Sequence, residues 1–263
     1  MSRFDDSVFS SQKDIHAYLA KHGDKVISIK KNSVKHADAF SGLINCQESA
    51  EAVAKAVTIM DNPPDIFHVK AVINTTNLYD SHGDVHIDGL WNKSQKEGRF
   101  IQHLQEHGNK FTDVIAEGDS LKVSVENTTF EKLGSKYSGA TQALIFDSEV
   151  DRDVNEYMWK LYSKGRVNQH SVGMRYVRML TAMDNKDYAE EYANFKKYID
   201  LVANKDDIKN GYFYPVLEAK VLEGSAVTRG SNHVTPTLSN QPGKSLTGSE
   251  PELSTRRKLI LYC

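Results

Sequence analysis

The sequence is short of cysteine and lacks long apolar runs, and each shortage excludes a class of protein. Two cysteines, Cys46 and Cys263, are too few among 263 residues for a disulfide framework, so a reducing compartment is expected. Neither cysteine lies beside a histidine that could activate it, which argues against a thiol nucleophile. No segment approaches the roughly 18 apolar residues that span a bilayer, and the N-terminus has no apolar signal core. The sequence therefore predicts a soluble protein without a membrane partner.

The sequence also lacks a large excess of either positive or negative charge. The chain has 33 Lys and Arg against 35 Asp and Glu, a formal net charge of −2, so no overall basic footprint for nucleic acid exists. The run Arg256-Arg257-Lys258 is a local exception near the C-terminus. Hydrophobic residues make up 39% of the chain, which is enough for a sizeable core. The composition predicts a globular protein with no specific nucleic-acid partner.

The first part of the chain, residues 1–64, is predicted to be a helical and strand extension. Serines at 10–11 precede a short helical pattern that ends near Gly23. The β-branched residues at 26–29 predict a short strand. A second helix is expected over residues 45–57, with Asn45 and Glu48 as a capping box. The run Asp-Asn-Pro-Pro at 61–64 then breaks the chain and marks a boundary.

From residue 65 to 230 the pattern is dominated by strands. Three helices interrupt them: one over 95–107, one between Ser148 and Gly165, and one near 184–210. Strands are expected at 66–75, 113–116, 121–125, 140–146, 169–178, 212–222 and 225–228. Because few helices separate the strands, the fold class predicted is α+β, a mainly antiparallel β-barrel flanked by helices. Residues 231–263 are rich in Ser, Thr, Pro, Gly and Asn and predict a flexible tail.

A first candidate site is an alternation of acidic residues and histidines at Asp80, His82, Asp84, His86 and Asp88. On a strand these side chains would share one face and could hold a metal ion. The glycines within and after the stretch favour a loop instead, where the alternation has no such meaning. A metal-dependent hydrolase built on this stretch and His107 is the alternative function, but no metal or other cofactor is predicted.

Two histidines, His103 and His107, form a second candidate. Their i, i+4 spacing would place both on one face of the helix expected at 95–107. The metalloprotease motif needs a glutamate directly after the first histidine, whereas Glu106 directly precedes the second. The spacing therefore does not predict a zinc protease.

A third candidate is Ser171 in the segment Gln169-His170-Ser171-Val172-Gly173. No Gly-x-Ser-x-Gly elbow surrounds it, which argues against an α/β-hydrolase. A serine hydroxyl needs a histidine within hydrogen-bond reach and a third group that orients this histidine. The segment by itself does not identify those partners.

Four segments taken together resemble the prohead proteases of tailed bacteriophages. They are NTTNLYDSHGDVHIDG at 74–89, LQEH at 104–107 before a strand, KGRVNQHSVGM at 164–174 and LEAKVLEGSAVT at 217–228. Their order and spacing agree with the family over roughly residues 67–232. The chain departs from the family pattern at His170, at Gly224, at Arg229-Gly230 and in a helical insertion near 184–210.

The resemblance implies a fold similar to that of the herpesvirus assembly proteases and a serine endopeptidase activity. It makes Ser171 the nucleophile and His107 the base. Glu223 is the candidate for the third catalytic member, with Glu218 and His233 as alternatives. Backbone N–H groups near Arg229 and Gly230 are the candidates for holding the oxyanion.

The resemblance also implies partners and a location. The substrates would be segments of the major capsid protein and of the scaffold, cleaved in the host cytoplasm inside the assembling prohead. Contact with the portal or the prohead shell, a homo-oligomer, and self-cleavage within residues 231–263 are further expectations. The remaining alternative is a non-catalytic capsid-assembly protein that keeps a protease-like fold.

Overall fold

The computed structural model describes residues 4–34, 59–98 and 100–242. The helix expected at 45–57, both cysteines and the basic run at 256–258 lie outside the described residues. No helix in the described ranges is long and apolar enough to cross a membrane.

The described chain is a mixed α+β structure, in agreement with the predicted class. The helices are α1 (Gln12–Asn32), α3 (Asn92–Glu97), α4 (Glu156–Ser163) and α5 (Ala189–Tyr198). The strands are β1 (Ile66–Thr75), β2 (Asp84–His86), β3 (Gln102–Gln105), β4 (Val114–Glu117), β5 (Leu121–Thr129), β6 (Ala140–Asp151), β7 (His170–Met179), β8 (Ala182–Met183), β9 (Tyr212–Ala226) and β10 (Thr237–Pro242).

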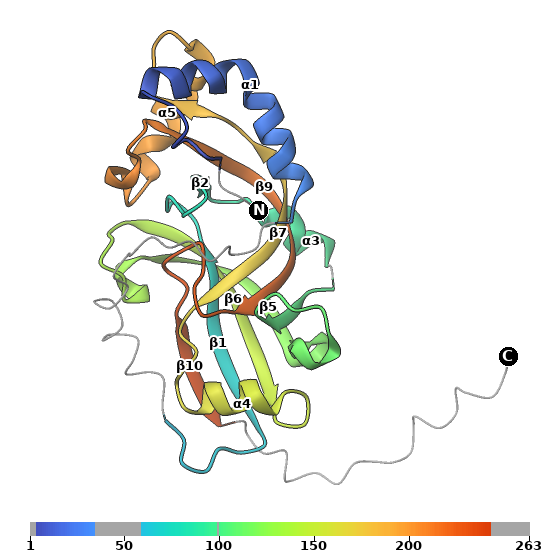
Figure 1. Ribbon diagram of the computed structural model, residues 1–263. Coiled ribbons are helices and arrows are strands. Elements are labelled where there is room, and N and C mark those ends of the chain that lie inside the picture. The colour runs from blue at the N-terminus through green and yellow to red at the C-terminus, as the bar shows by residue number, and fades with distance from the viewer. Residues whose placement is uncertain (1–3, 35–58, 99, 243–263) are drawn as a thin grey trace, which may run out of the picture.

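These strands form two sheets. One has the order β10-β1-β6-β5 and is antiparallel throughout. The other is built on β9, which pairs in parallel with β2 and β3 and antiparallel with β7 and β8, while β4 extends it beyond β3. In Figure 1, β1, β6, β10 and α4 occupy the lower end, α1 and α5 lie at the upper end, and β7 and β9 run between them.

The predicted closed barrel is wrong, because the two sheets remain open. Strands β4 and β5 follow one another around the short turn Gly118–Ser120, the place where the chain passes from one sheet to the other. Within the described ranges they do not pair, and each stands at the edge of its own sheet.

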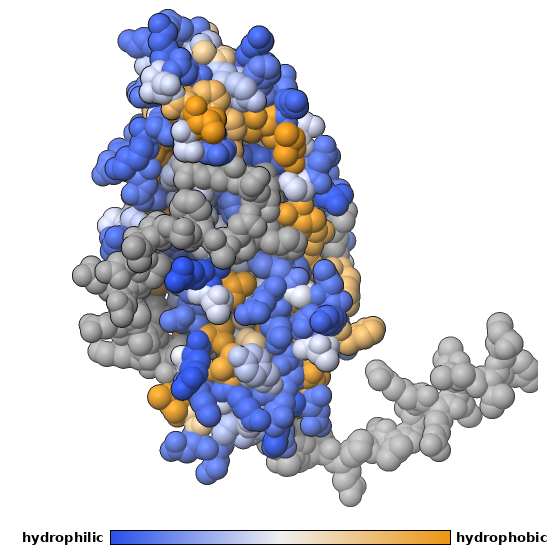
Figure 2. Space-filling model, viewed as in Figure 1, coloured by the Kyte–Doolittle hydropathy of each residue, from blue (hydrophilic) through white to orange (hydrophobic). Residues whose placement is uncertain are grey.

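The core lies where apolar faces of the two sheets meet. Buried residues of β1 and β6, such as Ile73 and Phe146, belong to one cluster with Val172 of β7 and Val221 of β9. Each large side chain buried in this way stabilises the fold by roughly 1.5–3 kcal/mol relative to exposure. Figure 2 shows hydrophilic residues over most of the described surface on the face in view, with apolar ones in small groups.

The N-terminal helix is longer than predicted. Ser11 caps it as expected, since its hydroxyl accepts a hydrogen bond from the Asp14 N–H at 3.2 Å. The helix then passes through Gly23 and includes residues 26–29, so the strand predicted there is wrong. Residues 15, 19, 23 and 30 are buried, close to a helical repeat, and this tertiary packing overrides the local stop signal.

The helix predicted at 95–107 is also wrong. Helix α3 ends at Glu97, with Gly98 in the left-handed conformation, and residues 102–105 form β3 between β4 and β9. The prediction for the segment after Ser148 is right in its second half only. Strand β6 continues to Asp151, and α4 begins after Asn155, whose side chain caps it.

The flexible tail predicted from Ser231 does not begin there. Residues 237–242 form β10, which pairs with β1. The polar residues of this segment are buried with partners: the Thr237 hydroxyl donates to the Val167 carbonyl at 2.6 Å, and the Asn240 amide donates to the Tyr162 carbonyl at 3.1 Å. The predicted helix near 184–210 is confirmed by α5.

Candidate active site

The pairing of β7 with β9 places Ser171 on the same face as Glu223. Ser171 lies directly opposite Ser225, and Gly173 lies directly opposite Glu223. Directly opposite residues of an antiparallel pair project from the same face of a sheet. A Cβ atom at Gly173 would stand 1.8 Å from Glu223 Oε1, so only glycine leaves room for this carboxylate. The Ser-x-Gly spacing therefore brings the serine and the carboxylate to one face.

His107 completes this cluster from the turn that follows β3, the strand that pairs with β9 on its other side. Its Nδ1 lies 2.7 Å from Glu223 Oε1, and each of the two side chains is only 10% exposed. A carboxylate only accepts hydrogen bonds, so Nδ1 carries the proton and Nε2 is the nitrogen that can accept one.

The two alternatives for the third member lie elsewhere. Glu218 stands opposite Arg178 and forms an ion pair with Lys93 at 3.3 Å. His233 lies within electrostatic reach of Asp80 and Asp207, and its partial burial lowers the pKa of its imidazole. Of the three candidates, Glu223 is the one that contacts the Nδ1 atom of His107.

The backbone of His107 is in a rarely populated conformation. Glu106 and His107 have φ angles of 50° and 57°, and the Gly108 N–H donates to the Gln105 carbonyl at 2.9 Å. This is a primed type I turn, which favours Asn-Gly at its two central positions. Each non-glycine residue in this region costs about 1–3 kcal/mol and persists where surrounding contacts hold it. Here the Glu106 N–H donates to the Ala226 carbonyl, and the His107 N–H donates to the Ser225 hydroxyl.

Ser171 is brought to the cluster but is not hydrogen-bonded to it. Its exposed fraction is 4%, and among the described residues its hydroxyl makes no hydrogen bond to His107. Catalytic hydrogen bonds are often long in proteins without substrate and shorten when it binds. The hydroxyl opposite, that of Ser225, is fully buried and donates to Glu223 Oε2 at 2.6 Å. Of the two serines, Ser171 is thus the one whose hydroxyl is not committed to the carboxylate.

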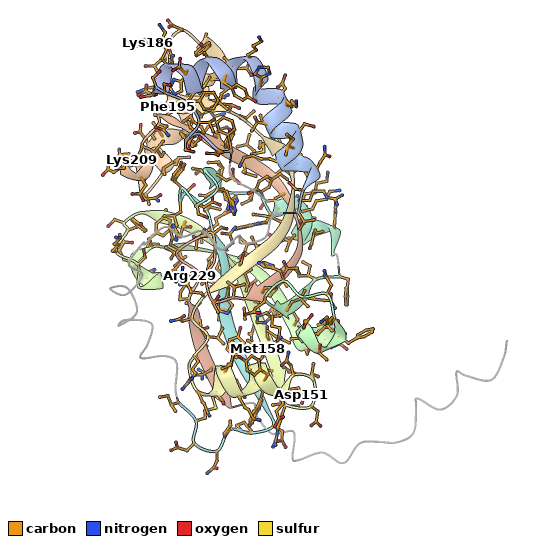
Figure 3. All side chains as sticks on the ribbon, viewed as in Figure 1. Asp151, Met158, Lys186, Phe195, Lys209 and Arg229 are labelled. Carbon is orange, nitrogen blue, oxygen red and sulfur yellow. The ribbon has the colours of Figure 1, made fainter. Side chains whose placement is uncertain are left out.

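The segment suggested for the oxyanion lies against the start of β7. A Cβ at Gly230 would stand 2.5 Å from the carbonyl oxygen of His170, so the chain approaches the residue before Ser171 closely. In Figure 3, Arg229 lies beside the same end of β7. Residues 229–230 therefore lie near the serine.

Behind the site, on the opposite face of β7, a series of hydrogen bonds joins β7, which carries Ser171, to β3, which directly precedes the turn with His107. His170 Nδ1 lies 2.9 Å from the Thr235 carbonyl, and Tyr162 Oη lies 2.9 Å from His170 Nε2 and 3.2 Å from His103 Nε2. His103 Nδ1 is 2.8 Å from the Ser148 hydroxyl. A carbonyl oxygen only accepts, so His170 Nδ1–H donates to Thr235 and, with both imidazoles neutral, His170 Nε2 accepts from the Tyr162 hydroxyl. Tyr162 Oη then accepts from His103 Nε2–H, and His103 Nδ1 accepts from the Ser148 hydroxyl. Tyr162 links β3 to β7 across β9 in this way.

Burial keeps the two histidines of this hydrogen-bonded series, His103 and His170, neutral. Burial lowers the pKa of His103 well below its usual range, and the neighbouring His170 lowers it further. Burial lowers the pKa of His170 to about 4. Between about pH 6.5 and pH 4 the unfolded chain therefore binds protons at these imidazoles that the folded protein does not.

We expect the free energy of unfolding to fall as the pH is lowered through this window. Each proton contributes a slope of about 1.4 kcal/mol per pH unit. Urea unfolding at several pH values between 7 and 4.5 measures the slope, and His170→Gln should reduce it by about one proton. The control is His68→Ala, because the His68 side chain is 45% exposed. An unchanged slope in His170→Gln would contradict this account.

In the acidic and histidine alternation at 80–88, Asp80, His82, Asp84 and His86 are buried and Asp88 is exposed, and part of the stretch is a strand rather than the predicted loop. Residues 84–86 form β2. Asp84 accepts from Lys30 at 2.5 Å and from the Tyr176 hydroxyl at 2.7 Å, and His86 lies between Asn74 and Tyr176. In the described ranges no three His, Cys, Asp or Glu side chains converge as metal ligands. These contacts fix α1 and β2 against β7.

Comparison with family models, with curated proteins and with solved structures finds no match to this chain.

Proposed function

We propose that the protein is a serine endopeptidase, with Ser171 as nucleophile, His107 as base and Glu223 as the group that orients the base. The observation that carries the proposal is the 2.7 Å contact between His107 Nδ1 and Glu223 Oε1, with Ser171 on the same face of the sheet. Three segments distant in sequence supply these residues, each at the position that the resemblance assigns. A histidine with a carboxylate on one nitrogen, near a serine, is the arrangement that activates a hydroxyl.

The geometry supports a defined course for the protons. His107 Nε2 takes the proton of the Ser171 hydroxyl as Oγ attacks a peptide carbonyl, and Glu223 stabilises the resulting imidazolium. His107 then gives this proton to the leaving amine as the peptide C–N bond breaks. Water attacks the acyl-enzyme with the same histidine as base, which releases the acid and restores Ser171. Backbone N–H groups near Gly230 are our candidates for holding the oxyanion.

The resemblance supplies the biological part of the proposal. The substrates are segments of the scaffold and of the major capsid protein, cut inside the prohead in the host cytoplasm. A relation in fold to the herpesvirus assembly proteases is part of the same proposal. It is supported by the positions of Ser171 on β7 and of His107 in the turn directly after β3, because both strands pair with β9.

Exchange of Glu223 for glutamine should reduce turnover by up to about ten-thousand-fold. The Ser225 hydroxyl donates to one carboxylate oxygen, so the glutamine oxygen would face Ser225 and its amide would face His107. The amide would make Nδ1 the acceptor and leave the proton on Nε2, the wrong tautomer for a base. Cleavage of a peptide from the capsid-protein or scaffold sequence measures the effect.

Glu218→Gln is the matched control. Glu218 lies on β9 as Glu223 does, but its carboxylate forms an ion pair with Lys93. The exchange should change turnover little. If Glu218→Gln were the damaging change, the role assigned to Glu223 would be wrong.

A further inference from the structure

Ser225 closes a ring of hydrogen bonds around the candidate catalytic pair. Its hydroxyl donates to Glu223 Oε2 at 2.6 Å and accepts from the backbone N–H of His107 at 3.1 Å. Glu223 Oε1 in turn accepts from Nδ1 of the same histidine at 2.7 Å. The ring therefore joins the main chain of His107 to its own imidazole through a serine and a carboxylate.

This ring has little freedom to rearrange. Ser225 has no exposed surface, so water does not compete for its hydroxyl. Its single proton is committed to Glu223, and one of its lone pairs is committed to His107. Each oxygen of the Glu223 carboxylate then has a partner, which fixes the plane of the carboxylate. The bond to the His107 N–H also supports the left-handed turn at residues 106–107, a conformation that needs such support.

We infer that Ser225 is a positioning residue that holds both the Glu223 carboxylate and the backbone of His107, and so sets the imidazole toward Ser171. The inference rests on the proposed function for its effect on reactivity. Ser225 is not itself the nucleophile, because its hydroxyl is buried and donates to the carboxylate. The two hydrogen bonds of its hydroxyl identify this role.

The reactivity of Ser171 toward a fluorophosphonate tests the inference. The reagent forms a P–O bond to an activated serine and releases fluoride, and intact-mass measurement follows the rate. Ser225→Ala should lower the rate about 10- to 100-fold, the effect of losing one hydrogen bond to a charged group. In a Glu223→Gln background the same change should have little further effect, because the two residues act as a unit. Ser225→Cys, with a weak donor, serves the same test if the alanine variant does not fold.

Ser148→Ala is the matched control for a merely structural effect. Ser148 is also fully buried, and its hydroxyl also contacts a histidine, His103, at 2.8 Å. It should lower thermal stability as Ser225→Ala does while leaving the acylation rate unchanged. Equal rates in the parent and Ser225→Ala, equal losses in both serine variants, or full additivity with Glu223→Gln would overturn the inference.

A proton NMR spectrum separates this inference from the proposed function. The His107 Nδ1 proton, held between nitrogen and carboxylate, should give a low-field resonance that is lost in Glu223→Gln and weakened in Ser225→Ala. If the parent protein shows this behaviour but does not react with the fluorophosphonate, the proposed function fails and the positioning role stands. If Ser225→Ala leaves the resonance unchanged, the positioning role fails.

Discussion

Replacement of Ser171 by alanine should abolish proteolysis and leave the fold intact. Loss of the nucleophile of a serine protease lowers turnover on the order of a million-fold, far more than a change in packing could. The position tolerates the exchange, because the Ser171 hydroxyl makes no hydrogen bond among the described residues and alanine only removes this oxygen. The measurement is cleavage of a capsid-protein or scaffold peptide, with circular dichroism and thermal unfolding to establish folding.

Ser124→Ala on β5 is the control, because this serine is only partly buried and lies outside the cluster. It should retain the activity of the parent. A folded Ser171→Ala protein that cleaves within about tenfold of the parent would contradict the assignment, since a lost nucleophile costs far more.

Exchange of His107 for asparagine should reduce turnover nearly as much, on the order of a million-fold, because the nucleophile and its base act as one unit. Asparagine is the sharper choice than alanine because it adopts the left-handed conformation readily, so the turn at φ 57° is kept. Its amide can still donate to Glu223 but cannot take a proton from Ser171. The variant therefore removes the base and preserves its surroundings.

His103→Gln is the comparison that the sequence invites, because His103 and His107 are four residues apart and form one candidate pair there. His103 is fully buried and hydrogen-bonded to Ser148 and Tyr162. Its loss should lower stability by about 1–3 kcal/mol through unpaired buried groups, while the folded fraction keeps most of its turnover. If His103→Gln removed turnover and His107→Asn did not, the base would be misassigned.

Elements with a strong local pattern could be predicted from the sequence. Strand β1 has the predicted bounds, and β9 covers the strand expected at 212–222 and continues through the first two residues of the one expected at 225–228. Elements decided by tertiary contacts could not. Helix α1 continues beyond Gly23 because Lys30 reaches the buried Asp84, and β3 forms because β9 and β4 offer backbone partners on both sides.

The C-terminal strand shows why polar composition was misleading. Residues 231–242 contain few apolar side chains, a composition typical of disorder. Their burial depends instead on hydrogen bonds: Asn232 bonds to Asn74 at 2.7 Å and to the Thr75 carbonyl at 2.9 Å. Such pairings join residues more than 150 positions apart, and a pattern along one chain does not contain them.

The candidate site, like the fold, could be predicted from the sequence only in part. The resemblance predicted Ser171, His107 and Glu223, and the structure places the last two in contact. Ser225 and the left-handed turn at Glu106–His107 were missed, because neither residue type is usual in its role. A signal was present in the Ser-x-Gly and Glu-x-Ser spacings, which face one another when β7 and β9 pair. Recognising it requires the register of the two strands.

Mapping the residue that a fluorophosphonate modifies is the most direct test of the central claim that Ser171, His107 and Glu223 form one catalytic unit. The account predicts a single adduct on the folded protein, located at Ser171 by peptide mass spectrometry. The adduct should be absent in Ser171→Ala and in His107→Asn, and should form far more slowly in Glu223→Gln. An unmodified parent protein, or an adduct on another serine that forms equally well in His107→Asn, would contradict it.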